Sequence, residues 1–275
     1  MLKAVRKAKK TIDIVIFRFD RTELEEALEA AVARGVTVRA LIAHTNRGGE
    51  SQLRKLEMRL LKAGVLVART ADNLPRYHGK LMVADDTLYV LGFNYTKLDI
   101  EKSRSFGIMM RDKKLVKEAT TLYEADTTRQ PYVPGHERLV VSPETSRARL
   151  SKFIKGAKKQ LLIYDAKVSD NAIQKLLQDR VKAGVEIRIL GKLEKSIEGV
   201  EARKLAPMRL HVRAMIRDGH SAFIGSQSLR KLELDKRREV GVLIANTPIA
   251  KKMQAVFDAD WKASVPAKAD TTSAA

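Results

Sequence analysis

The sequence contains no cysteine, few aromatic residues and no long apolar run. Without cysteine the chain cannot form disulfides, thiolate zinc sites, iron–sulfur clusters or a cysteine nucleophile. Aromatic residues make up only 5% of the 275 positions, so a stacking platform for single-stranded nucleic acid is not evident. Apolar runs such as residues 14–17 are too short to cross a bilayer, and the basic N-terminus lacks the apolar stretch of a signal peptide. We therefore expect a cytoplasmic protein whose membrane contact is at most peripheral.

Positive charge is in excess. Lys and Arg number 53 against 33 Asp and Glu, which gives a formal net charge of +20. This balance favours polyanionic partners, either nucleic acid or an anionic lipid surface, although lysines that coat the helices of a soluble enzyme would give the same total. With 44% apolar and 31% charged residues, the chain is typical of a folded globular protein, and collagen-like or globally disordered structure is excluded.

Two halves of the chain follow one plan. The segment around Gly35 recurs around Gly184, and residues 97–107 recur as residues 231–241. The first half is about 16 residues longer between its two repeated segments. Residues 51–63 fill that gap with apolar side chains at helical spacing, so they predict an inserted helix. The hairpin that follows Asp85 in the first half is one residue shorter than its counterpart after Asp218 in the second half.

Each half alternates helices and strands before a run of strands and a final helix. Thr22-Glu23-Leu24-Glu25 predicts a capping box for a helix that ends before Gly35, and residues 170–183 before Gly184 repeat the unit. Residues 36–42 and 185–190 are typical of strands buried on both faces. The pattern predicts an α/β fold of two pseudo-symmetric halves, each a mixed β-sheet flanked by helices, packed as an α/β/α sandwich with the active site between them.

The expected boundaries follow from the proline and glycine positions. We assign residues 1–130 to the first half, 131–138 to a linker, 139–263 to the second half and 264–275 to a disordered tail. Residues 139–141 predict an opening strand of the second half, whose counterpart in the first half would lie upstream of Met1. We therefore expect the opening strand of the first half to be missing from this sequence.

Each half also carries the same polar constellation: a histidine, a cation two residues later, an aspartate five residues after that and a turn of small residues. The members are His78, Lys80, Asp85 and a turn with Asn94 in the first half, and His211, Arg213, Asp218 and a turn with Ser226 and Ser228 in the second. On a strand, residues i and i+2 share a face, so each histidine and its cation can address one ligand atom. Two such strands meeting at a pseudo-two-fold axis would place two imidazoles and two cations around one anion.

That arrangement suits a phosphodiester. One imidazole attacks phosphorus, the other protonates the leaving oxygen, and the cations hold the nonbridging oxygens. No metal-ligand spacing is visible in the sequence, and we expect neither a metal nor another cofactor. Because both half-sites lie in one chain, a monomer would suffice.

The doubled motif resembles the phospholipase D superfamily, and most closely bacterial cardiolipin/phosphatidylserine synthase-like proteins, whose second motif leads to a Glu-Val-Gly strand, here residues 239–241. The resemblance implies a covalent phosphohistidine that ends in hydrolysis or in transfer to an alcohol. It also implies roles for individual residues: nucleophile and acid for His78 and His211, phosphate clamp for Lys80 and Arg213, and polar turn contacts for Asn94, Ser226 and Ser228. Asp85 and Asp218 belong to the motif, but we expect them to brace a strand rather than touch substrate.

Three positions depart from the family pattern: Arg213 replaces lysine, Ser228 replaces asparagine, and Ser105 occupies the position that corresponds to Glu239. A carboxylate bonded to an imidazole favours the protonated ring. If Glu239 supports His211, that histidine stays cationic and suits the acid role. His78 would then lack a carboxylate and be the nucleophile.

The substrate stays open between two classes. The resemblance slightly favours a phospholipid, whereas the net charge favours DNA or RNA and thus a nuclease-type phosphodiesterase. A third hypothesis is a catalytically decayed duplicate that binds polyanions or anionic membranes, supported by Arg213, Ser228 and Ser105. The paired histidines and the complete set of His78, Lys80 and Asn94 oppose it.

Overall fold

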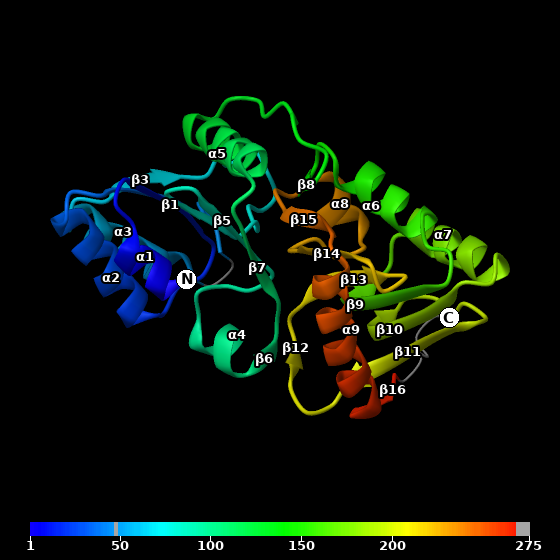
Figure 1. Cartoon of the computed structure of the whole chain (residues 1–275). Coiled ribbons are helices and arrows are strands. Elements are labelled where there is room, and N and C mark those ends of the chain that lie inside the picture. Colours follow the sequence, from blue (N-terminus) through cyan, green and yellow to red (C-terminus); the bar gives the residue numbers. More distant parts are fainter. Residues whose placement is uncertain (47–48, 268–275) are drawn as a thin grey trace.

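The computed structural model describes residues 1–46 and 49–267. Two mixed β-sheets lie side by side, and each carries helices (Figure 1). A two-stranded parallel sheet joins the halves, formed by β6 (Ser103–Arg104) and β12 (Arg209–Leu210). The predicted α/β class, with mixed sheets flanked by helices, is confirmed.

The first sheet has the strand order β3-β2-β1-β4-β5-β7. Its strands are β1 (Thr11–Ile16), β2 (Thr37–Ile42), β3 (Leu66–Arg69), β4 (Leu81–Ala84), β5 (Thr87–Leu91) and β7 (Gly107–Met110). Strands β1, β2 and β3 are parallel, and β4, β5 and β7 continue the sheet as antiparallel pairs. The helices of this half are α1 (Leu2–Lys7), α2 (Thr22–Ala33), α3 (Glu50–Lys62), α4 (Lys97–Glu101) and α5 (Lys113–Thr128).

The second sheet has the order β16-β11-β10-β9-β13-β14-β15-β8. Its strands are β8 (Leu139–Val141), β9 (Gln160–Val168), β10 (Glu186–Leu193), β11 (Val200–Leu205), β13 (Arg213–Arg217), β14 (Ser221–Gly225), β15 (Val240–Ala245) and β16 (Ser264–Pro266). Its helices are α6 (Ser146–Lys155), α7 (Asn171–Lys182), α8 (Lys231–Asp235) and α9 (Thr247–Lys262). The predicted strand at residues 139–141 is β8, which pairs with β15.

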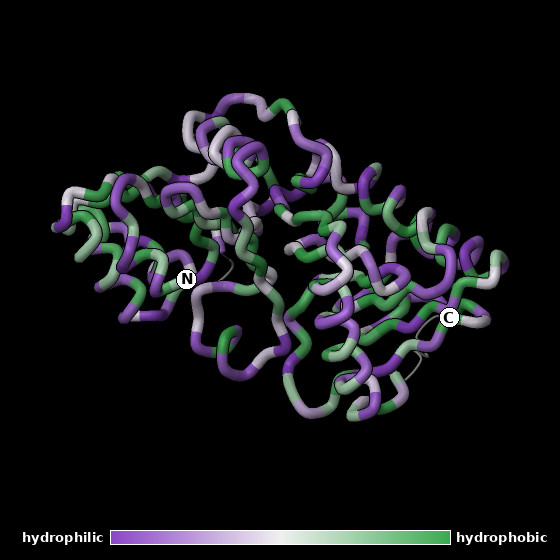
Figure 2. Tube along the Cα trace, in the orientation of Figure 1, coloured by the Kyte–Doolittle hydropathy of each residue, from purple (hydrophilic) through white to green (hydrophobic). Residues whose placement is uncertain are grey.

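Apolar residues gather along the strands and the inner faces of the helices, as Figure 2 shows. One buried cluster packs α1, α2 and α3 against the first sheet, and a second packs α6 and α7 against the second sheet. The largest cluster is shared, because Val90 of β5, Ile224 of β14 and Phe257 of α9 all belong to it. The halves are therefore joined through a common core, and burial of its apolar area fixes their relative position.

Several local predictions are confirmed. Helix α3 occupies the segment expected to be an inserted helix. Gly35 and Gly184 adopt φ values of +84° and +82° just after α2 and α7, the left-handed conformation that glycine tolerates at a helix end. The hairpin between β4 and β5 turns through two residues, whereas that between β13 and β14 needs three.

Two local predictions are wrong. The N-cap of α2 is Arg21 rather than Thr22, and no side-chain cap is made there; Arg21 instead pairs with Glu23 and Glu101. The expected disordered tail is ordered at its start, because β16 pairs antiparallel with β11 and extends the second sheet. The rest of that tail, residues 268–275, lies outside the described residues.

Candidate active site

Two short segments from different halves run side by side at the junction of the sheets. Tyr77 and Arg238 form a parallel bridge, and the Arg238 carbonyl accepts hydrogen bonds from the backbone N–H of His78 (2.7 Å) and Gly79 (3.0 Å). A Cβ atom on Gly79 would lie 2.7 Å from Val240 Cγ2. Only glycine allows this approach, so the residue between the motif histidine and lysine lets the two halves meet. His78 thereby lies beside Glu239.

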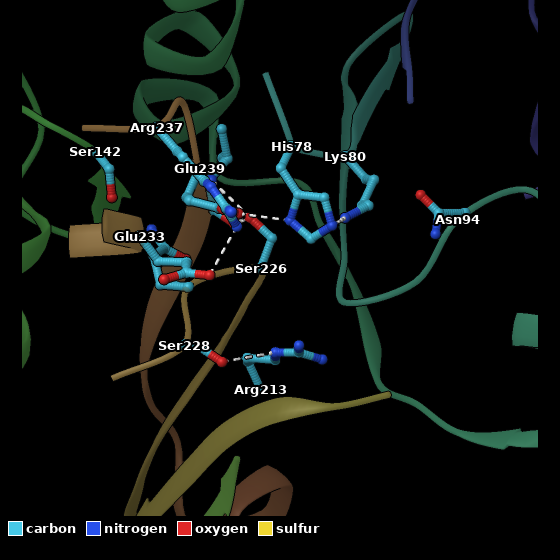
Figure 3. Close-up of polar contacts among 12 residues, drawn as sticks. His78, Lys80, Asn94, Ser142, Arg213, Ser226, Ser228, Glu233, Arg237 and Glu239 are labelled. Atoms are coloured by element: carbon cyan, nitrogen blue, oxygen red, sulfur yellow. Dashed lines mark hydrogen bonds and ion pairs between the residues drawn. The ribbon is translucent and has the colours of Figure 1, made fainter. Parts of the chain in front are cut away.

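A chain of three side chains results (Figure 3). The Nδ1 atom of His78 lies 2.8 Å from Glu239 Oε2, and its Nε2 atom lies 2.8 Å from Lys80 Nζ. Glu239 and Lys80 are both completely buried. Since an ionised carboxylate only accepts, Nδ1 carries the imidazole proton, and Nε2 keeps a lone pair on the side of Lys80. An oriented imidazole with an unprotonated Nε2 is the state a nucleophile needs.

The other histidine meets a carboxylate of the opposite half. His211 Nδ1 lies 3.4 Å from Asp99 Oδ2, and its backbone N–H donates to the Arg104 carbonyl at 3.2 Å. Asp99 also accepts hydrogen bonds from Asn94 Nδ2 at 2.6 Å and from Arg209 at 2.6 Å. Asn94 Oδ1 is buried and has no partner in the described part of the chain. Asn94 therefore positions Asp99 and keeps one acceptor atom free.

Burial and positive charge dominate the electrostatics. Burial, together with the charges of Lys80 and Arg213, holds the pKa of His78 well below its usual value. Burial and the same two cations lower the pKa of His211 to about 3, although Asp99 opposes the shift. Lys80 and Arg213 act on both rings, so both histidines lie within electrostatic range of the same two cations.

The two buried partners of His78 are shifted toward neutrality. Burial lowers the pKa of Lys80 to about 7, opposed by the charge of Glu239. Burial likewise raises the pKa of Glu239 to about 7, opposed by the charge of Lys80. Both groups therefore change charge near neutral pH, where small changes of charge in the site decide their protonation.

The predicted support of His211 by Glu239 is wrong, and so is the prediction that His78 lacks a carboxylate partner. Glu239 bonds His78, because β15 begins beside the backbone that carries His78, whereas His211 lies near Asp99. The prediction that His211 stays cationic is also wrong for the ligand-free protein, since its pKa is lowered. The sequence held a signal for Asp99: the repeat aligns it with Glu233, so an acidic residue recurs at that position.

Arg213, the cation of the second motif, is linked to the turn that carries Ser226 and Ser228. Arg213 Nε donates to Ser228 Oγ at 3.2 Å (Figure 3), and Ser228 in turn donates to Asp165 Oδ1 at 2.6 Å. Ser226 Oγ accepts the backbone N–H of Val240 at 3.1 Å, so it fixes the turn against β15 beside Glu239. Asp165, which sequence reasoning missed, is the buried end of this network.

The motif aspartates lie outside the site. Asp85 accepts the backbone N–H groups of Lys9, Lys10 and Thr11 at 2.8–3.1 Å, and Asp218 accepts those of Lys158, Lys159 and Gln160 at 2.7–3.2 Å. Each carboxylate thus braces the start of β1 or β9, the role expected of it from the sequence. Neither hydrogen-bonds a motif histidine.

The histidines themselves do not lie within strands, because β4 begins at Leu81 and β13 at Arg213. Both rings project instead from the segments that enter these strands. Within the described residues, no group of three or more His, Asp or Glu side chains is placed to hold a metal ion. No helix of residues 1–46 and 49–267 is both long and apolar enough to cross a membrane.

The family model described as "Cardiolipin synthase, PLD-like domain" matches residues 1–127 and 150–261, which cover most of the chain. The chain belongs to the phospholipase D superfamily. Members of this superfamily act on phosphodiesters, in hydrolysis or in phosphatidyl transfer. No curated protein sequence matches this phospholipase D-like chain.

Two solved structures share the fold across nearly the whole chain. Polyphosphate kinase from Porphyromonas gingivalis aligns with a TM-score of 0.78 at 16% identity, over 99% of this chain and 50% of that one. This chain therefore spans half the length of that kinase. Phosphatidylserine synthase from Haemophilus influenzae aligns with a TM-score of 0.73 at 12% identity, over 95% of this chain and 82% of that one. At these identities the likeness shows the fold.

Proposed function

We propose that the protein is a metal-independent phosphodiesterase or phosphatidyltransferase that forms a phosphohistidine on His78. The observation that carries this proposal is the buried chain from Glu239 through His78 to Lys80. Glu239 fixes the ring and its tautomer, so the Nε2 lone pair is available for attack. No comparable hydrogen bond holds His211 Nδ1 within the described residues.

In the first step His78 Nε2 attacks phosphorus, and the bond from phosphorus to the leaving oxygen breaks as the N–P bond forms. Lys80 shifts from Nε2 to a nonbridging oxygen that it shares with Arg213, and Arg213 also holds the other nonbridging oxygen. His211 gives its proton to the leaving oxygen. The ring of His78 becomes positively charged, and the Glu239 carboxylate stabilises that charge through Nδ1–H.

In the second step water or an alcohol attacks phosphorus, and His211 takes the proton of the attacking hydroxyl. The bond to His78 breaks and the nucleophile is restored. His211 needs a proton before the first step, whereas the cations keep it neutral in the free protein. A bound phosphate brings a negative charge between those cations, which raises the pKa of His211 and lets it act as the acid.

For the substrate we favour a phospholipid. The matching family is named for cardiolipin synthase and one structural neighbour is a phosphatidylserine synthase. Peripheral contact of a +20 chain with an anionic bilayer agrees with such a substrate. The same charge favours DNA or RNA as the second candidate, which would make the protein a nuclease-type phosphodiesterase.

Hydrolysis of bis-p-nitrophenyl phosphate in EDTA tests the proposal. We expect the wild type to be active, both His78→Ala and His211→Ala to be inactive, and the control His44→Ala, an exposed histidine, to match the wild type. Wild-type protein quenched in alkali and denaturant, in which a phosphohistidine is stable, should carry the phosphoryl group on His78. Absence of activity in the wild type would instead support the decayed, polyanion-binding hypothesis, and loss of activity in EDTA would contradict metal independence.

Parallel assays separate the substrates. Phosphatidylglycerol vesicles, plasmid DNA and RNA are each incubated with wild type and His78→Ala under the same conditions. Activity on vesicles that depends on His78 supports the phospholipid, and release of glycerol with formation of a diphosphatidyl product indicates transfer rather than hydrolysis. Cleavage confined to DNA or RNA assigns the nuclease alternative.

A further inference from the structure

The second half of the site holds its cation differently from the first. Arg213 donates through Nε to Ser228 Oγ, and Ser228 donates to Asp165 Oδ1. The other carboxylate oxygen of Asp165 accepts the backbone N–H of Leu229 at 2.6 Å. Asp165 is only 1% exposed, so a buried carboxyl group is committed to this network.

The internal repeat shows that this network is confined to the second half. In the first half β1 pairs with β2 at Ile16 and Ile42, and the corresponding pair of β9 and β10 is Asp165 and Gly191. A carboxylate thus replaces an apolar side chain, and a glycine replaces the isoleucine opposite it. Lys80 and Asn94 of the first half correspond to Arg213 and Ser228 of the second.

The backbone around Asp165 is adapted to this exchange. Gly191 has φ +147°, and a Cβ atom at this position would lie 1.5 Å from the Asp165 carbonyl oxygen. The register between β9 and β10 also shifts just after this pair. Only glycine permits this close approach, so the strand pair has been rebuilt around the position that carries the carboxylate.

The chemistry of arginine explains why these substitutions go together. A lysine ammonium is a single nitrogen, whereas a guanidinium can be anchored through Nε and still present two Nη atoms in a fixed plane. Neither Nη atom of Arg213 hydrogen-bonds another residue in the described part of the chain. In Figure 3 the guanidinium extends from Ser228 toward the side of the site where His78 and Lys80 lie.

We propose that Asp165 and Ser228 are positioning residues that orient Arg213, so that its two Nη atoms bind two oxygens of the substrate phosphate. The second half has exchanged a lysine–asparagine pair for a coupled arginine–serine–aspartate unit. Arg213 and Ser228 are therefore parts of a rebuilt clamp rather than signs of decay. The effect of the clamp on catalysis rests on the proposed function, whereas its effect on phosphate binding does not.

Calorimetric titration with inorganic phosphate, together with KM for bis-p-nitrophenyl phosphate, tests the clamp. Asp165→Asn and Ser228→Ala keep the charge of Arg213 but remove its orientation, so each should weaken phosphate binding and raise KM by about tenfold. In an Arg213→Lys background the same two substitutions should have no further effect, because the anchored Nε is already gone. Restoration of phosphate affinity in Arg213→Lys/Ser228→Asn, the pair used by the first half, would support the exchange further.

Asp170→Asn is the matched control, because Asp170 is a buried carboxylate bonded to an arginine, Arg147, outside this network. It should alter the melting temperature without altering phosphate affinity. Three outcomes would refute the clamp. Folded Asp165→Asn and Ser228→Ala could bind phosphate as tightly as the wild type, or the two substitutions could weaken binding just as much in the Arg213→Lys background. The wild type could also bind no phosphate. If phosphate binding follows the expected pattern while no turnover is seen, the clamp stands and the proposed enzymatic function fails.

Discussion

Replacement of Glu239 by glutamine tests the crossed pairing of carboxylates and histidines. The substitution keeps the size of the side chain but removes the charge that holds His78 Nδ1–H at 2.8 Å. A hydrogen bond to a charged group contributes about 1.5–3 kcal/mol. This bond strengthens when attack makes His78 positive, so its loss raises the barrier to phosphohistidine formation. We therefore expect that step to slow roughly tenfold to a hundredfold.

Rapid-quench kinetics can isolate that step. With a p-nitrophenyl phosphodiester, the burst of p-nitrophenolate reports formation of the phosphohistidine, and the later linear phase reports its breakdown. Glu239→Gln should slow the burst for good and poor leaving groups alike. Asp99→Asn acts beside His211, which donates the leaving-group proton, so it should slow the burst only when the leaving group is a poorly acidic alcohol. Glu26→Gln, at an exposed position of α2, is the control.

The opposite pattern would refute this reasoning. If Glu239→Gln left the burst with p-nitrophenyl substrates unchanged and slowed only poorly acidic leaving groups, Glu239 would serve the acid, and its partner His78 would be that acid rather than the nucleophile. An unchanged burst for both substrates would remove Glu239 from the mechanism altogether.

Three further outcomes follow from the structure. The pKa values of Glu239 and Lys80 are about 7 and that of His211 is about 3, and the proposed mechanism needs Glu239 ionised and the other two protonated; kcat/KM should therefore fall steeply above pH 7, and Lys80→Arg, which keeps its charge, should make that fall shallower. Asp85→Asn should lower the free energy of unfolding by about 1–3 kcal/mol in a denaturant titration and leave KM unchanged, whereas Asp86→Asn, in the exposed turn, should change neither quantity. Arg238→Met leaves two carboxylates without their cation and should lower the unfolding free energy by about 3–5 kcal/mol.

Features that depend on neighbours along the chain could be predicted from the sequence. The glycines after α2 and α7, the inserted helix α3 and the unequal hairpin turns all follow from local spacing. A bracing role for Asp85 was expected too, but the strand that it braces, β1, lies 74–76 residues away in sequence and could not be named from local spacing. The capping box was wrong: α2 starts one residue earlier than predicted, with Arg21 as its N-cap, and Arg21 pairs with Glu23 and with Glu101, which is distant in sequence.

Contacts between the two halves could not be predicted from the sequence in the same way. The repeat aligns Glu239 with Ser105, and this alignment suggested that each histidine takes its carboxylate from its own half. The pairing actually depends on how the two sheets pack, since the shared core brings β15 beside the segment that carries His78. Asp165 was hidden for a related reason: its partner Ser228 is 63 residues away, and no local pattern marks a buried carboxylate.

In the proposed mechanism the crossed contacts also determine which histidine attacks. Exact two-fold symmetry would make the two imidazoles equivalent, and either could be the nucleophile. Here His78 has a carboxylate at 2.8 Å and a titratable lysine at its other nitrogen, whereas His211 has a carboxylate at 3.4 Å and no hydrogen bond to Nδ1 within the described residues. The oriented ring stabilises the covalent adduct, and the less constrained ring can exchange a proton with an entering or leaving oxygen. The division of roles therefore comes from the differences between the halves, and these differences are the positions at which the sequence departs from its own repeat.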